Sequence, residues 1–161
     1  MRISAVLPAL VSLASALLPR SAINNGVEEK SMLVVNADQT LILDADWTNF
    51  TFTNVDVPVS PNFNFFTSPA ISGLFVTDLY CAGDTFAIYN NGTFLMETSS
   101  PLFGADCQLR TANASLAFSQ NYWSSATVPL ASGFSYNITI VPTASPWSAG
   151  VAAIRWVSGR A

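Results

Sequence analysis

The chain has 161 residues, a length that suits one domain with a hydrophobic core of its own. Ten acidic residues against six basic ones give a net charge of −4, and a surface of this sign disfavours nucleic acid as a partner. Histidine is absent, which excludes Ser-His-Asp and Cys-His catalysis and zinc sites built on imidazole.

The first residues predict an export signal. Met1-Arg2 is a positive start, an uncharged apolar run continues to Leu18, and Ala14-Ser15-Ala16 has the small-x-small pattern of a cleavage site. We expect a signal peptide over residues 1–16, with cleavage as late as residue 22 as an alternative, and no membrane span in the mature chain. An uncleaved membrane anchor is the competing interpretation. The polar C-terminus predicts no lipid anchor.

Residues 17–31 predict a flexible segment that precedes one domain over residues 32–161. In that domain, short β-prone runs alternate with turn residues, which favours an all-β fold, an antiparallel, jelly-roll-like β-sandwich. Alternation predicts that three sets of side chains point inward, namely Phe50 and Phe52, then Tyr136, Ile138 and Ile140, then Ala152, Ile154 and Trp156. The expected strands are residues 33–36, 40–43, 48–53, 62–66, 74–80, 85–89, 93–97, 126–130, 134–141 and 151–157, and residues 112–118 predict one short helix.

Residues 73–101 are the part around which we expect the fold to be organised. Asn91-Gly92 separates two β-prone runs, and this pair predicts a type I′ hairpin turn because both of its positions need positive φ. The break at Cys81-Ala82-Gly83-Asp84 precedes them. The pattern therefore predicts a meander of three consecutive strands.

The two cysteines predict one disulfide. Cys81 ends the first strand of the expected meander, and Cys107 follows the third. A single disulfide agrees with an oxidising compartment, and a free reactive thiol is the alternative.

Four Asn-X-Ser/Thr sequons also agree with export and, if they are used, indicate a eukaryotic source. We expect those on polar strand faces or at the hairpin tip to be accessible, and the one in the irregular region 102–121 is less clearly placed. The sequon asparagines are Asn49, Asn91, Asn113 and Asn137.

The segment Cys81–Gly92, C-A-G-D-T-F-A-I-Y-N-N-G, resembles a hairpin of small secreted fungal proteins of unassigned role. In that group a D-x-F-x-(V/I)-(F/Y)-(D/N)-N-G pattern is followed by a cysteine segment. The segments Pro129–Gly133 and Tyr136–Ile140, followed by Ser145-Pro146 and Gly150–Trp156, are similar as well, so the likeness covers residues 71–157. The resemblance implies a fold and carries no catalytic motif.

Two tryptophans in Ser- and Pro-rich loops are candidate ligand contacts. Trp123 with Tyr122, and Trp147, offer aromatic faces on which a sugar ring can stack. We expect residues 126–130 and 134–141 to form a hairpin, which places Trp123 and Trp147 at one end of the sandwich. The alternative is that each ring caps the core, the role that we expect for Trp47 and Trp156.

Carboxylates are the remaining candidates for chemistry. Calcium ligation would need two loops to converge among Asp44, Asp46, Asp78, Asp84 and Asp106, and no calcium-loop motif is present. For Asp84 a turn-capping role is the favoured alternative. A carboxylate-based glycoside hydrolase would use Asp78 and Glu97, which the meander places on adjacent strands. We expect no metal, no cofactor and no catalytic residue.

These observations predict a secreted, non-enzymatic β-sandwich that acts outside the cell by binding, with a cell-wall or surface carbohydrate as the ligand. An effector-like protein that acts on a host or competitor is one alternative, and the carboxylate hydrolase is the other. The sequence predicts neither the oligomeric state nor retention in a wall.

Overall fold

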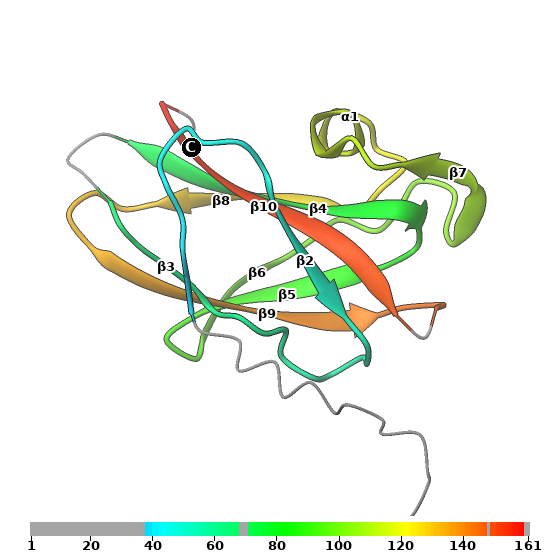
Figure 1. Ribbon diagram of the computed structural model, residues 1–161, viewed down its shortest axis with the longest axis horizontal. Helices are drawn as coiled ribbons and strands as arrows, with labels where there is room; N and C mark the ends of the chain where they lie inside the picture. The colour runs from blue at the N-terminus through cyan, green and yellow to red at the C-terminus, as the bar shows by residue number, and fades with distance from the viewer. Residues whose placement is uncertain (1–37, 68–70, 148, 160–161) are drawn as a thin grey trace, which may run out of the picture. The chain divides into compact units, whose positions relative to one another are not determined.

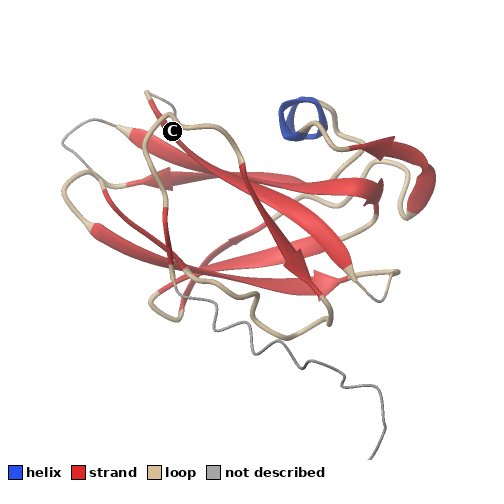
Figure 2. Cartoon of the chain, viewed as in Figure 1, coloured by secondary structure: helices blue, strands red, loops and turns tan. Residues whose placement is uncertain are grey.

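The computed structural model describes residues 38–67, 71–147 and 149–159, all within one compact unit that spans residues 34–161. The predicted signal peptide, the segment 17–31 and the strand expected over residues 33–36 lie outside the described residues. Figure 2 shows that strands dominate the described part, with one short helix. The elements are β1 (Gln39–Thr40), β2 (Thr48–Phe52), β3 (Phe63–Phe66), β4 (Ser72–Ala82), β5 (Thr85–Asn90), β6 (Thr93–Glu97), β7 (Asp106–Thr111), α1 (Ala114–Ser119), β8 (Ser125–Leu130), β9 (Ser135–Ala144) and β10 (Gly150–Ser158).

Two five-stranded sheets pack against each other as a sandwich (Figure 1). The first sheet has the order β1-β3-β9-β5-β6. The second has the order β2-β10-β4, and β8 and β7 pair with successive parts of β4. The described pairs are antiparallel except β1 with β3, which is parallel. The predicted all-β sandwich is confirmed, with this one parallel pair as a departure.

Two expected strand pairings are wrong. The hairpin of β5 and β6 forms around Asn91 and Gly92, whose φ angles of 48° and 77° are both positive, as predicted. However, β4 belongs to the second sheet, so no three-stranded meander exists. Likewise, β8 and β9 lie in different sheets and do not form a hairpin. Both connections cross between the layers.

The main core lies between the sheets and includes most of the side chains that the alternation predicts to point inward. Phe50 and Phe52 of β2, Ile138 and Ile140 of β9, and Ile154 of β10 are all buried there. The rings of Phe50 and Phe52 each contact Phe86 edge-on, with centroid distances of 6.0 and 5.4 Å. Trp156 is buried in the same core, as expected.

A second, smaller core covers the outer face of the second sheet. The predicted helix is confirmed as α1, whose N-cap residue Asn113 accepts a hydrogen bond from the Leu116 amide at 3.0 Å. Phe118 of α1 stacks on Phe75 of β4, with 4.4 Å between the ring centroids. Trp47 is half-buried at this core, not in the main one. Residues 72–79 of β4 are therefore buried on both faces.

The strand β7 is a feature that the sequence does not predict, because residues 102–121 have no clear alternation. The disulfide between Cys81 and Cys107 is confirmed, and it joins β7 to the end of β4. Figure 1 shows β7 and α1 beside one end of the sandwich. No helix among the described residues is long and apolar enough to span a membrane.

Removing the disulfide should lower the free energy of unfolding by about 3–4 kcal/mol, because the bond closes a loop between positions 26 residues apart. The double variant Cys81→Ala/Cys107→Ala avoids free thiols. Urea unfolding of this variant and of the oxidised protein gives the difference. A loss below about 1 kcal/mol would contradict a stabilising role for the bond.

Candidate functional site

The chain leaves the second sheet at the end of β4 through an unusual backbone segment. Tyr80 has a φ of 60°, which is rare for a residue with a side chain, and Gly83 has a φ of 151°. The pairing with β7 is irregular between Cys81 and Ala82. A Cβ atom at Gly83 would lie against Pro146, so the β9–β10 loop contacts the crossover.

Asp78 holds this crossover in place from inside the sandwich. It follows Leu74 and Val76 at two-residue spacing, so its side chain points between the sheets. Its Oδ1 atom accepts the Leu79 amide at 2.8 Å, and its Oδ2 atom accepts the amides of Gly83 and Asp84 at 3.1 and 3.2 Å. The turn is thus capped by Asp78, and the capping role expected of Asp84 is wrong.

Asp84 brings a second carboxyl group to the same place. Asp78 and Asp84 are 0% and 1% exposed, and their side chains share a hydrogen bond. The Asp84 backbone is also fixed, because its carbonyl accepts the Ser124 hydroxyl at 2.6 Å. The two described basic side chains bond elsewhere, Arg110 to the Cys107 carbonyl and Arg155 to that of Ala45.

The pair retains a proton at pH values where an ordinary aspartate has lost it. Burial and the charge of Asp84 raise the pKa of Asp78 to about 8, and burial raises the pKa of Asp84. Asp78 accepts three backbone N–H groups, whereas Asp84 Oδ1 is buried without a hydrogen-bond partner among the described residues. Hydrogen bonds with the side chains of Ser145 and Asp78 oppose the rise at Asp84, so the retained proton belongs to the pair and not to one of its members.

A pocket of about 250 Å³ opens beside this carboxyl pair. Its lining includes Asp84 together with the side chains of Tyr80 and Trp147, which are 46% and 37% exposed. The disulfide residue Cys81 and the first residues of β10 complete the wall. The predicted ligand residue Trp147 therefore lies at a pocket. Tyr80 was not identified from the sequence, and Asp84 was considered there only as a calcium ligand or a turn cap.

Trp123 does not have the exposed face that we expected. Its ring is only 3% exposed, and its Nε1 atom donates to the Tyr80 carbonyl at 2.9 Å. It packs in the smaller core with Leu79 and Ala117. The Trp123 ring thus holds the Tyr80 carbonyl through a hydrogen bond. It has the core role that was the alternative to a ligand contact.

Tyr122 is half-buried and stacks on Phe103, with 5.4 Å between the ring centroids. Its own ring meets Trp123 edge-on at 6.1 Å. Tyr122 does not line the pocket of Trp147. The three predicted stacking residues therefore do not form one platform.

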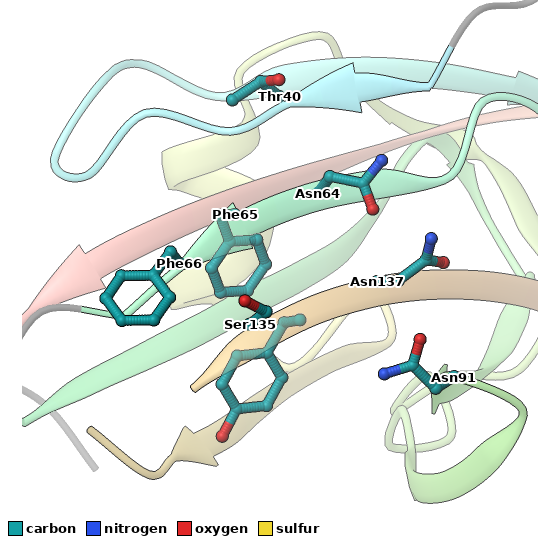
Figure 3. A pocket seen from close by; sticks show the side chains of 8 residues that line it. Thr40, Asn64, Phe65, Phe66, Asn91, Ser135 and Asn137 are labelled. Atoms are coloured by element: carbon teal, nitrogen blue, oxygen red, sulfur yellow. The ribbon is translucent and has the colours of Figure 1, made fainter. Parts of the chain in front are cut away.

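A second hollow, of about 330 Å³, lies on the outer face of the first sheet and carries no charged side chain in its lining. Figure 3 shows the side-chain amides of Asn64, Asn137 and Asn91 following one another from β3 across β9 to the β5–β6 turn, with Phe66 and Ser135 to one side. Two of its lining residues, Asn91 and Asn137, are sequon asparagines. Asn91 is exposed and Asn137 partly exposed, and the sequon residues outside this hollow, Asn49 and Asn113, are exposed.

Among the described residues, the other candidate carboxylates do not gather into a metal site. Glu97 lies on β6 in the first sheet, where it accepts the Thr143 hydroxyl at 2.6 Å, so its expected position on a strand adjacent to Asp78 is wrong. Asp44 accepts the amide and hydroxyl of Ser158, and Asp106 accepts the Gln108 amide. Within the described residues, no group of three or more His, Cys, Asp or Glu side chains is placed to hold a metal ion.

Comparison of the chain with protein-family models, with curated proteins and with solved structures finds no match. Function is therefore inferred from the geometry of the site.

Proposed function

We propose that the protein is a secreted, non-enzymatic binding protein and that the pocket beside Trp147 takes a carbohydrate, a sugar of a cell wall or cell surface. The observation that carries this proposal is the combination of two partly exposed aromatic side chains and one carboxyl group in a single pocket, Trp147 and Tyr80 with Asp84. Aromatic faces match the CH groups of a sugar ring, and a carboxyl oxygen accepts from its hydroxyl groups.

The state of the carboxyl pair supports a neutral ligand. With one proton shared, the two carboxyl groups together carry a single negative charge, and the buried Asp84 Oδ1 atom has no hydrogen-bond partner among the described residues. The remaining lining is largely apolar, from Leu79, Ala149 and Val151. A hydroxyl group is a better partner for such a site than an anion, which would lie next to the negative charge of the carboxyl pair.

The geometry of this site supports ligand binding rather than glycoside hydrolysis. A glycosidase needs two carboxyl groups that flank the scissile bond, about 5–10 Å apart. Here the two carboxyl groups that come together share a hydrogen bond, and Asp78 is fully buried. Asp78 cannot touch a substrate and does not line the pocket, so only one carboxyl group of the pair is placed to contact a ligand.

Export is the part of this proposal that the sequence supports most directly, through the predicted signal peptide and the sequons. The disulfide between Cys81 and Cys107 agrees with it, because such bonds persist in oxidising compartments.

Truncation of Trp147 to alanine should weaken carbohydrate binding by about 1–3 kcal/mol and leave the free energy of unfolding nearly unchanged, because an exposed ring makes few core contacts. A glycan array on the mature protein identifies the sugar, and titration calorimetry with that sugar measures the effect. Phe103→Ala is the matched control, since Phe103 is an exposed aromatic residue outside this pocket. An array without a bound glycan, or equal affinity of Trp147→Ala and the control, would contradict the proposal.

A further inference from the structure

The second hollow, on the outer face of the first sheet (Figure 3), is called the groove below. It combines two sequon asparagines with an exposed aromatic ring. Antiparallel pairing sets Asn64 opposite Asn137 and Phe66 opposite Ser135. Because side chains two residues apart share one face of a strand, all four belong to the outer face. The backbone amide of Asn91 donates to the Asn137 carbonyl at 3.0 Å, which closes the other side of the groove.

The side-chain amide of Asn137 differs from those of Asn64 and Asn91, because it makes no hydrogen bond to a described residue. The amide nitrogen of Asn91 donates to Asn90 Oδ1 at 3.3 Å, and that of Asn64 donates to Asp38 Oδ2 at 3.0 Å. Among the described residues, the Asn137 side chain makes no such bond. Both N–H groups of its Nδ2 atom are therefore without a protein partner among the described residues, so a substituent there displaces no hydrogen bond.

Phe66 is unusually placed for a large apolar side chain. It is 61% exposed, and it lies one two-residue step along the sheet from the Asn64–Asn137 pair. A sugar ring attached at Asn137 that followed the strands would lie over Ser135 and meet this ring. The polar partners that a sugar needs are beside it, in the Asn64 amide and the Ser135 hydroxyl.

We propose that this groove seats the first sugar of an N-linked glycan carried by Asn137, with the sugar's CH face on Phe66 and its polar groups toward Asn64 and Ser135. The linkage forms when Asn137 Nδ2 attacks the anomeric carbon of a diphosphate-activated sugar donor. The N–C bond forms, the C–O bond to the diphosphate breaks, and the nitrogen loses one proton. The glycan then covers apolar surface that would otherwise face water.

This inference goes beyond the carbohydrate ligand at Trp147, because the sugar here is covalently attached and lies on another part of the fold. It needs passage through a glycosylating secretory pathway and no activity of the Trp147 pocket. The two proposals therefore fail independently. Asn91 also lines the groove, but it lies at the exposed tip of the β5–β6 turn, on the side away from Phe66 (Figure 3).

The test uses the full chain secreted from a eukaryotic host that adds N-glycans. Mass spectrometry of the mature protein should find Asn137 modified. Trimming each glycan to its first sugar keeps the linkage, and a nuclear Overhauser effect should then connect protons of that sugar with the Phe66 ring. An unmodified Asn137 in the secreted protein, or a modified Asn137 without this contact, would overturn the proposal.

Thermal unfolding measures whether the seated sugar stabilises the fold. Asn137→Gln should lower Tm by about 2–6 °C, whereas Asn49→Gln, at a sequon on the exposed edge strand β2, should change it by less than about 1 °C. In a Phe66→Ala background, the shift caused by Asn137→Gln should disappear. If that shift persists without Phe66, the ring does not seat the sugar. Because Gln at 137 could disturb β9 by itself, the same comparison is made with unglycosylated protein, in which Asn137→Gln should have no effect.

Discussion

Raising the pH from about 4 to about 9 should lower the free energy of unfolding by several kcal/mol, and the buried pair Asp78–Asp84 is the cause. Burial and the charge of Asp84 raise the pKa of Asp78 to about 8 in the folded protein, against 3.8 for an ordinary aspartate. Between these values the folded state binds a proton that the unfolded state has released. The pair's contribution is therefore fully present below about pH 4 and is lost as the pH rises through about 8.

Urea unfolding at several pH values, followed by tryptophan fluorescence, measures this dependence. Asp84→Asn should flatten it, because the substitution removes the negative charge that opposes ionisation of Asp78, and the new amide can donate a hydrogen bond to the Asp78 carboxylate. The control is Asp44→Asn. Hydrogen bonds from Ser158 lower the pKa of Asp44, so this exposed group loses its proton at acid pH and should not change the slope above pH 4.

A free energy of unfolding that is constant or increases between pH 4 and pH 8 would show that the folded state binds no such proton. The same result for Asp84→Asn and the parent protein would assign the dependence to another group. Proteins whose carboxylates are paired with basic groups lose stability in acid. The pH dependence of stability predicted here has the opposite direction. It means that this fold is most stable at acid pH.

The side chains that point inward along several strands could be predicted because these strands have one buried face and one solvent-exposed face. Phe50 and Phe52 alternate with exposed Asn49 and Thr51, and Ile138 and Ile140 alternate with half-buried Asn137 and Thr139. When one face is buried, a shift by one residue would expose the whole apolar set, so the pattern determines the orientation. The turn at Asn91 and Gly92 could also be predicted from the local sequence, because few residues tolerate two successive positive φ angles.

The assignment of strands to sheets could not be predicted in this way. A short connection such as Gly83-Asp84 is compatible with a hairpin or with a crossing between layers. Here the crossing is held by Asp78, which accepts the amides of Gly83 and Asp84, and by a distant residue, Ser124, which donates to the Asp84 carbonyl. In the sequence Asp78 is one polar residue in an apolar run, and nothing nearby shows that its partner is six positions later.

The candidate site depends on the same long-range packing. Trp147 was predicted from its own loop, and it does lie at a pocket. Tyr80 was not predicted, because it belongs to a β-prone run and is exposed through its φ of 60°. Trp123 was predicted to be exposed because its neighbours are polar, but α1 and β4 enclose it. An irregular region that packs on a sheet changes which aromatic residues are accessible.

Substituting Trp123 by alanine should lower the free energy of unfolding by about 3–5 kcal/mol, in contrast to the near-zero effect expected for Trp147→Ala. The change removes a ring that is 3% exposed, and it leaves the Tyr80 carbonyl without the Nε1 donor that it has at 2.9 Å.

Trp123→Phe separates these two contributions, because it retains most of the apolar contact and removes the donor. We expect a loss of about 1–3 kcal/mol for this variant, and we expect the near-ultraviolet circular dichroism of the remaining aromatic residues to change where Tyr80 relaxes. Urea unfolding at pH 5 keeps the carboxyl pair protonated, so only the tryptophan varies. A loss below about 1 kcal/mol for Trp123→Ala would mean that the ring is not a core element, and it would restore Trp123 as a candidate ligand contact.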